Sequence, residues 1–126
     1  MSVHVYTGPR AGRHRSTPGL RVVPAVLAAV TIALQICWPL TDGSTRDLLT
    51  VLSVITFLLA VGSHAVLVRG VAWALGWAVA ATGIGLAVEV LGVHTGLPFG
   101  EYAYTGRLGP AVLGVPVVIA LAWAMM

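Results

Sequence analysis

Long apolar runs separated by short polar connections dominate the chain. Three runs, residues 22–41, 48–68 and 71–93, reach the length of a membrane-spanning helix. About 20 residues are needed, because a helix rises about 1.5 Å per residue across a hydrocarbon core of about 30 Å. A fourth run, residues 111–126, is shorter but apolar to its last residue. The pattern predicts an all-α integral membrane protein, a polytopic transmembrane bundle with four helices in this chain.

The fourth run ends without a polar flank or a basic anchor. We therefore expect the chain to be the N-terminal fragment of a larger bundle and to be inactive alone. Composition supports the membrane assignment, because the chain is 58% hydrophobic and 9% charged, whereas soluble domains carry about 25% charged residues.

The arginines predict the orientation of the chain. Residues 1–21 mix arginine with Gly, Pro, Ser and Thr, and we expect a disordered basic tail there. With this tail inside, the inner side carries Arg10, Arg13, Arg15, Arg21 and Arg69. The outer side carries Arg46 and Arg107. Cytoplasmic segments carry the excess of positive charge, so we expect a multi-pass protein of the cell membrane with a cytoplasmic N-terminus. This placement of the charge favours the lipid bilayer as partner and gives no indication of nucleic-acid binding.

The third run carries two stripes of residues at helical spacing. One is made only of small residues and would let another helix approach closely: Gly76, Ala80, Gly83 and Ala87. The other ends on a carboxylate: Ala78, Thr82, Gly85 and Glu89. The second stripe predicts that Glu89 projects toward a neighbouring helix or a cavity.

Glu89 is the only carboxylate inside an apolar span. Ionisable residues at such depth are costly and usually face the interior of the bundle. A carboxyl group shielded from water is a candidate general acid. A structural glutamate at the interface, hydrogen-bonded to a loop or a helix, explains the residue equally well. His64 falls near the opposite membrane face, and we interpret it as a packing or interface histidine.

The connection over residues 94–110 is unusual for a loop, with four glycines and two prolines. Tyr102 and Tyr104 alternate, so an extended backbone would aim both rings to one side. Long structured loops are often functional, but tyrosines at headgroup level are the ordinary alternative. The chain shows no metal-ligand spacing and no nucleotide-binding loop.

A motif of glycines, prolines and aromatic residues extends from Glu89 to the end of the chain. Its positions are Glu89, Gly92, Gly96, Pro98, Phe99, Gly100, Tyr102, Tyr104, Leu108-Gly109-Pro110, Gly114-Val115-Pro116, Leu121-Ala122-Trp123 and Met125-Met126. This motif resembles the membrane carotenoid biosynthesis protein family, which includes the carotenoid 1,2-hydratases and the bisanhydrobacterioruberin hydratase. Residues 22–68 match that family only in character.

The resemblance implies hydration of the terminal double bond of an acyclic carotenoid end group to a tertiary alcohol, which makes the full-length protein a carotenoid hydratase of the hydro-lyase type. Glu89 is then the candidate acid, and Glu101 or His94 the candidate base or the residue that positions the water. Phe99, Tyr102 and Tyr104 are the candidate wall facing the carbocation. The chemistry needs no metal or redox cofactor. The implied partners are a carotenoid substrate and other membrane enzymes of the pathway.

Two other functions remain open from the sequence. A lycopene-cyclase-like protein would use the same protonation, but an internal alkene would capture the cation. A non-catalytic membrane subunit or small transporter would use Glu89 to relay protons or bind a cation. Such proteins often pair intramembrane charges, and Glu89 has no basic partner within the apolar runs.

Overall fold

The computed structural model describes residues 18–126. It contains three long helices, α1 (Val23–Cys37), α2 (Gly43–Arg69) and α3 (Val71–Thr95). With the 3-10 turns η1 (Pro18–Arg21) and η2 (Trp38–Leu40) added to α1, all three are long and apolar enough to cross a membrane. The predicted class, an all-α membrane bundle, is confirmed. The predicted basic tail falls outside the described residues, apart from the η1 turn.

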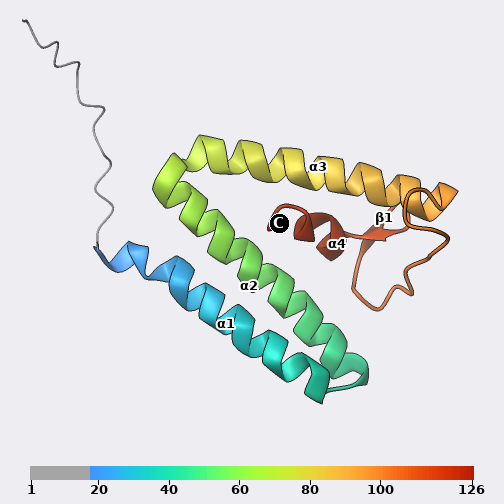
Figure 1. The fold of residues 1–126 in the computed structure, drawn as a ribbon, viewed down its shortest axis with the longest axis horizontal. Coiled ribbons are helices and arrows are strands. Elements are labelled where there is room, and N and C mark those ends of the chain that lie inside the picture. The colour runs from blue at the N-terminus through green and yellow to red at the C-terminus, as the bar shows by residue number, and fades with distance from the viewer. Residues whose placement is uncertain (1–17) are drawn as a thin grey trace, which may run out of the picture.

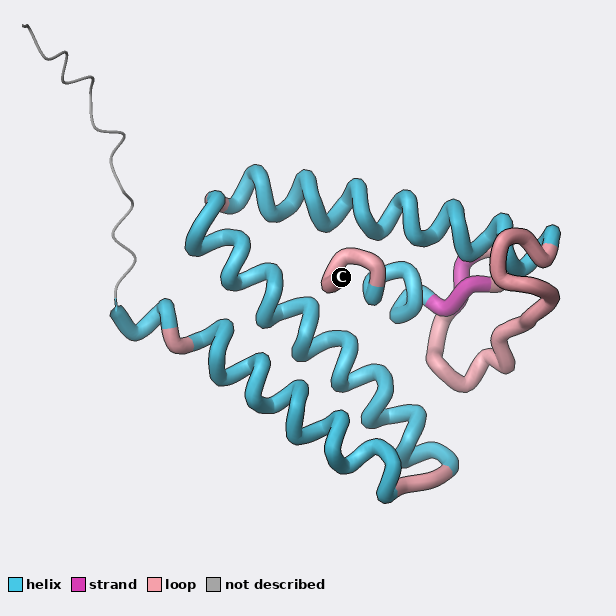
Figure 2. The backbone as a smooth tube through the Cα atoms, in the orientation of Figure 1, coloured by secondary structure: helices cyan, strands magenta, loops and turns pink. Residues whose placement is uncertain are grey.

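Polar contacts hold α1 and α2 together as an antiparallel pair (Figure 2). Near the middle of the pair, the Thr31 hydroxyl donates to Oγ1 of Thr56 at 2.8 Å. Toward the α1–α2 connection, Trp38 Nε1 donates to Oγ1 of Thr50 at 2.9 Å. Hydrogen bonds of this kind help helices to associate in lipid, where no hydrophobic force drives them together.

The second helix begins five residues before the apolar run that predicted it. Asp42 precedes Gly43, and its carboxylate pairs with Arg46 at 2.8 Å in the first turn. The Arg46 guanidinium also lies 4.7 Å from the ring centroid of Trp38. The helix begins before the apolar run because such a run marks only the part of a helix that lipid covers, and the polar first turn lies beyond it.

Helices α2 and α3 diverge from a one-residue connection at Gly70, and the C-terminal segment lies in the opening between them (Figure 1). Gly70 has φ +92°, a conformation that favours glycine. The C-terminal segment contacts both helices, which also contact each other directly.

The prediction of one helix over residues 111–126 is wrong. The segment forms a two-stranded hairpin, β1 (Ala111–Val112) and β2 (Val115–Pro116), followed by the short helix α4 (Val117–Ala122). Leu113 and Gly114 connect the strands, and both have positive φ, as in a type I′ turn. Pro116 has no N–H group and immediately precedes α4. An apolar run by itself does not distinguish a buried hairpin from a helix. Here Gly114 in the turn and Pro116 before α4 favour the hairpin.

The two stripes of α3 have different environments. Gly85 and Glu89 of the second stripe are buried, which confirms its predicted inward direction. The stripe of small residues is exposed along its whole length in the described structure. Large apolar side chains are also exposed on all three long helices, as expected for surfaces that face lipid.

Candidate active site at Glu89

The Glu89 carboxylate is the centre of a hydrogen-bonded cluster. Glu89 is 9% exposed. The hydroxyl groups of Tyr102 and Tyr104 both donate to Oε2, each at 2.8 Å. Trp123 Nε1 donates to Oε1 at 3.2 Å. The cluster therefore joins three segments of the chain: helix α3, the loop that follows it, and the C-terminal segment after α4.

Glycines on α3 make room for the donors. Gly85 and Gly92 lie one turn before and one turn after Glu89, on the same buried face. A side chain at Gly85 would overlap the Trp123 ring, and one at Gly92 would overlap the Tyr102 hydroxyl. The spacing Gly85-x-x-x-Glu89-x-x-Gly92 thus allows the indole and the phenol to approach the carboxylate along the helix surface.

The loop after α3 turns back over the helix end. Gly96 ends α3 in the left-handed conformation, with φ +71°, and the N–H of Gly100 donates to its carbonyl at 2.6 Å. The chain then runs without regular structure through Tyr102 and Tyr104. Their rings meet edge to face, with centroids 5.7 Å apart. The prediction that both rings point to one side is confirmed by their shared acceptor oxygen.

An ion pair ties the far part of this loop to α2. Both Nε and the terminal Nη2 of Arg107 lie 2.9 Å from Oδ2 of Asp47. The pair is partly exposed, so its own contribution to stability is small, about 0–1 kcal/mol. Its effect is geometric, because it joins the end of the loop to the helix on the other side of the C-terminal segment.

The cluster has a definite donor and acceptor pattern. An indole N–H can only donate, so Oε1 of Glu89 must accept. Burial raises the pKa of both tyrosines, and the hydrogen bond to Glu89 raises it further. Both phenols therefore stay protonated donors at neutral pH. The arrangement can hold a carboxylate in place away from water and can pass a proton between it and a phenol.

Other predicted site residues lie outside this cluster. His94, Phe99 and Glu101 are exposed, and within residues 18–126 no hydrogen bond or ring contact joins them to Glu89. The predicted packing residue His64 is also exposed. The structure describes no group of three His, Cys, Asp or Glu residues that could hold a metal ion.

Trp123 is the site residue that sequence reasoning missed. It belongs to the motif that carries the family resemblance, but an indole in an apolar run is ordinary in a membrane protein. The useful signal was the pair of glycines flanking Glu89, which implies large neighbours on that face. Residue type alone does not say which aromatic side chain fills the space.

Comparison with known proteins identifies a family match in the region of the chain that forms the Glu89 cluster. The family model described as carotenoid biosynthesis protein matches residues 49–126. This range contains Glu89 and all three of its hydrogen-bond donors. No curated protein and no solved structure shows significant similarity to the chain. The family match covers more than half of the sequence, and the chain belongs to the carotenoid biosynthesis protein family.

Proposed function

We propose that this protein adds water across the terminal C=C bond of an acyclic carotenoid end group and forms a tertiary alcohol. The observation that carries the proposal is the buried Glu89 carboxylate, held by two phenols and one indole within a membrane-spanning helix. Membership of the carotenoid biosynthesis family supports a carotenoid as the substrate.

Hydration of a trisubstituted alkene begins with protonation of carbon, which needs an acid shielded from bulk water. Glu89 lies six residues before the end of α3, about 9 Å along the helix axis. A carotenoid dissolved in the bilayer reaches this depth without leaving the lipid. The site and the substrate therefore share one environment.

Protonation builds a tertiary carbocation, and the cluster offers two ways to stabilise it. The faces of Tyr102 and Tyr104 can attract a cation, with about 0.5–2 kcal/mol for each ring. The Glu89 carboxylate, once it has given up its proton, carries the opposite charge to the cation. Both effects strengthen as charge develops, so they favour the transition state over the bound alkene.

The hydrogen bonds between Glu89 and the two tyrosines provide the proton route. For the reaction Glu89 takes up a proton, and its hydrogen bond to one tyrosine reverses. Glu89 then gives this proton to the oxygen of that tyrosine as the phenol gives its own proton to the less substituted alkene carbon. A water oxygen then bonds to the tertiary carbon. The spare proton of this water returns through a phenol to Glu89. One water is consumed, one C–H and one C–O bond form, and the protein is unchanged.

Glu89→Gln tests the proposal. The amide keeps the size of the side chain but cannot supply the proton. In a bacterial host that accumulates an acyclic carotenoid and expresses the full-length protein, we expect the hydrated product to fall at least about 100-fold, because general acid catalysis contributes about 10² to 10⁴. The matched control is Glu101→Gln, which changes an exposed carboxylate outside the cluster and should leave the product near normal.

Product analysis identifies the reaction. Hydration adds the mass of one water to the carotenoid, whereas cyclisation adds nothing. In heavy water the product should carry one deuterium on the carbon beside the new alcohol carbon. Near-normal hydration by Glu89→Gln, or a product with unchanged mass, would refute the proposed reaction.

A further inference from the structure

An ion pair closes a ring in the chain. Helices α2 and α3 diverge from Gly70, and the loop after α3 returns toward the start of α2 (Figure 1). Arg107 of this loop pairs with Asp47 of α2, 60 residues earlier in the chain. The C-terminal segment lies in the opening that the ring surrounds. The pair therefore completes the frame around the segment that supplies one of the Glu89 donors.

The loop after α3 has polar contacts on two sides. On one side, Tyr102 and Tyr104 donate to Oε2 of Glu89. On the other side, Nε and Nη2 of Arg107 both lie 2.9 Å from Oδ2 of Asp47. Within the described part of the chain, no second hydrogen bond or ion pair connects this loop to α2. The ion pair is therefore the specific polar contact that places the loop relative to α2.

The turn that carries Arg107 is short and close to the tyrosines. Gly106 and Gly109 bracket it with φ of +75° and +93°, a conformation that favours glycine. Arg107 follows Tyr104 by three residues, which span at most about 11 Å of chain. The position of the guanidinium and the position of the phenol are therefore closely linked.

The start of α2 leaves Asp47 available for this contact. Its neighbour Arg46 pairs with Asp42 at 2.8 Å and lies over the Trp38 ring. That guanidinium is thus held toward the connection between α1 and α2. Asp47 pairs with the loop instead, and its side chain is 27% exposed, against 57% for Arg107.

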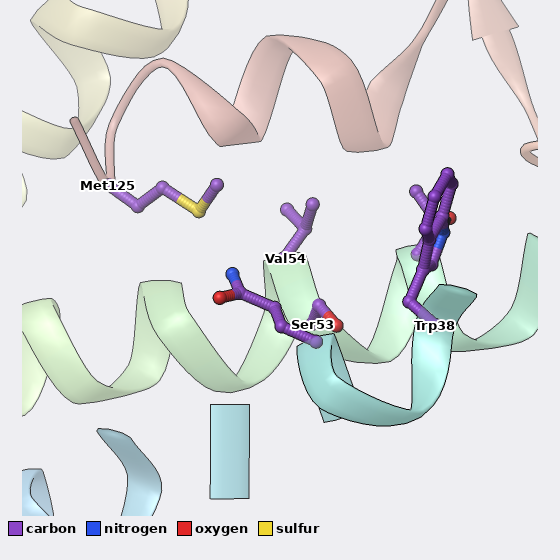
Figure 3. A pocket seen from close by; sticks show the side chains of 6 residues that line it. Trp38, Ser53, Val54 and Met125 are labelled. Atoms are coloured by element: carbon purple, nitrogen blue, oxygen red, sulfur yellow. Dashed lines mark hydrogen bonds between the residues drawn. The ribbon is translucent and has the colours of Figure 1, made fainter. Parts of the chain in front are cut away.

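Packing beside this part of α2 is incomplete. An open groove of about 330 Å³ lies between α1, α2 and the C-terminal segment. Figure 3 shows Val54 on α2 between Trp38 at one end and Met125 at the other. Thr50 also lines the groove, about one helical turn from Asp47. Protein interiors usually have few such voids, so packing alone fixes the distance from α2 only loosely, and a polar contact adds precision.

We propose that Arg107 and Asp47 are positioning residues, which hold Tyr102 and Tyr104 on the Glu89 carboxylate by joining the loop to α2. Neither member of the pair hydrogen-bonds to Glu89, so both act through the tyrosines. The importance of this role for the reaction rests on the proposed function, in which the two phenols relay the proton.

Titration of the two phenols measures the positioning without reference to the reaction. A phenol that donates to a carboxylate must give up that bond to ionise, so the midpoint of tyrosinate absorbance falls when the loop is held less firmly. The full-length protein is titrated in detergent, and the spectrum of the same protein with Tyr102→Phe and Tyr104→Phe is subtracted. Helix content, measured by circular dichroism, checks that each variant is folded.

Charge reversal is the change to make. Arg107→Asp and Asp47→Arg each remove the attraction of a partly exposed pair and add a repulsion of similar size. Each should lower the midpoint by roughly 0.3–1.5 pH units. The matched control is Asp42→Asn, which breaks an ion pair at the same end of α2 that does not involve the loop. It should leave the midpoint unchanged.

The exchanged pair, Asp47→Arg with Arg107→Asp, tests whether the two residues act on each other. It restores opposite charges with the same two side-chain types, and arginine keeps its charge at high pH. The midpoint should therefore return close to that of the unchanged protein. Single reversals that leave the midpoint where it was, or an exchanged pair that fails to recover it, would overturn the proposal.

Hydration is the second measurement, and it separates this inference from the proposed function. Product yield should fall in each single reversal and recover in the exchanged pair, because released phenols cannot relay the proton. If Glu89→Gln keeps near-normal hydration while the reversals still lower the midpoint, the proposed reaction fails and the positioning stands. If Glu89→Gln loses hydration but the reversals leave the midpoint unchanged, the positioning role fails alone.

Discussion

Glu89 and Trp123 are separated by 34 residues, yet Trp123 Nε1 lies 3.2 Å from Oε1 of Glu89. This contact connects the C-terminal segment to α3 above Gly85, where only a glycine leaves room for the indole. Because Oε2 is taken by the two tyrosines, Trp123 is the single described donor to the other oxygen. It therefore holds the carboxylate plane in one orientation.

Trp123→Phe should reduce hydration by about 10-fold or more. The substitution keeps an aromatic ring over Gly85 and removes the N–H donor, and a hydrogen bond to a charged group contributes about 1.5–3 kcal/mol. Product yield per amount of membrane protein is the measurement. Trp77→Phe, on the exposed face of α3, is the matched control and should behave like the unchanged protein. Equal yields from the two variants would show that the indole N–H does not matter.

Gly92→Ala should displace Tyr102 from Glu89 and destabilise the protein by about 1–3 kcal/mol, the usual cost of overpacking. The new methyl group would overlap the Tyr102 hydroxyl. Gly83→Ala on the same helix meets nothing within 4 Å and should be neutral or slightly stabilising, because alanine favours helix over glycine by about 1 kcal/mol. Thermal unfolding in detergent, together with product yield, checks both. A harmless Gly92→Ala would argue against the close approach of Tyr102.

Tyr102 and Tyr104 should ionise at higher pH than a free tyrosine. Burial and the bond to Glu89 raise the pKa of both phenols above the usual value of about 10. Their folded-state pKa is raised, so their contribution to stability is complete below about pH 10 and is lost as pH rises through the raised values. Tyrosinate absorbance of the folded protein, compared with Tyr102→Phe and Tyr104→Phe, measures the shift. Phenols that titrate near pH 10 would show that the hydrogen bonds do not form in solution.

The orientation inferred from the arginines is open to a direct test. We expect the N-terminus in the cytoplasm and the loop 94–110 on the outer side. Single cysteines at Ser2 and Thr105, introduced after Cys37→Ser, can be exposed to a membrane-impermeant thiol reagent in intact cells. Thr105→Cys should react and Ser2→Cys should not. The reverse pattern would mean that the arginine excess does not set the topology of this chain.

Sequence periodicity was sufficient for the membrane helices and for the direction of Glu89. An apolar run of about 20 residues has essentially one stable form in lipid, because every backbone group must be hydrogen-bonded within the segment. Helical spacing then places Gly85 and Glu89 on one face whatever the rest of the chain does. The alternation of Tyr102 and Tyr104 was similarly local, so their common direction followed from an extended backbone.

Other features were decided only by the tertiary structure. Residues 111–126 are as apolar as a helix, but a type I′ turn at Leu113 and Gly114 and the proline at 116 give a hairpin and a short helix. Trp123 reaches Glu89 because this folded segment enters the opening between α2 and α3. His94, Phe99 and Glu101 are close to the site in sequence but exposed. Sequence patterns report local geometry, whereas the approach of distant side chains depends on how the elements pack.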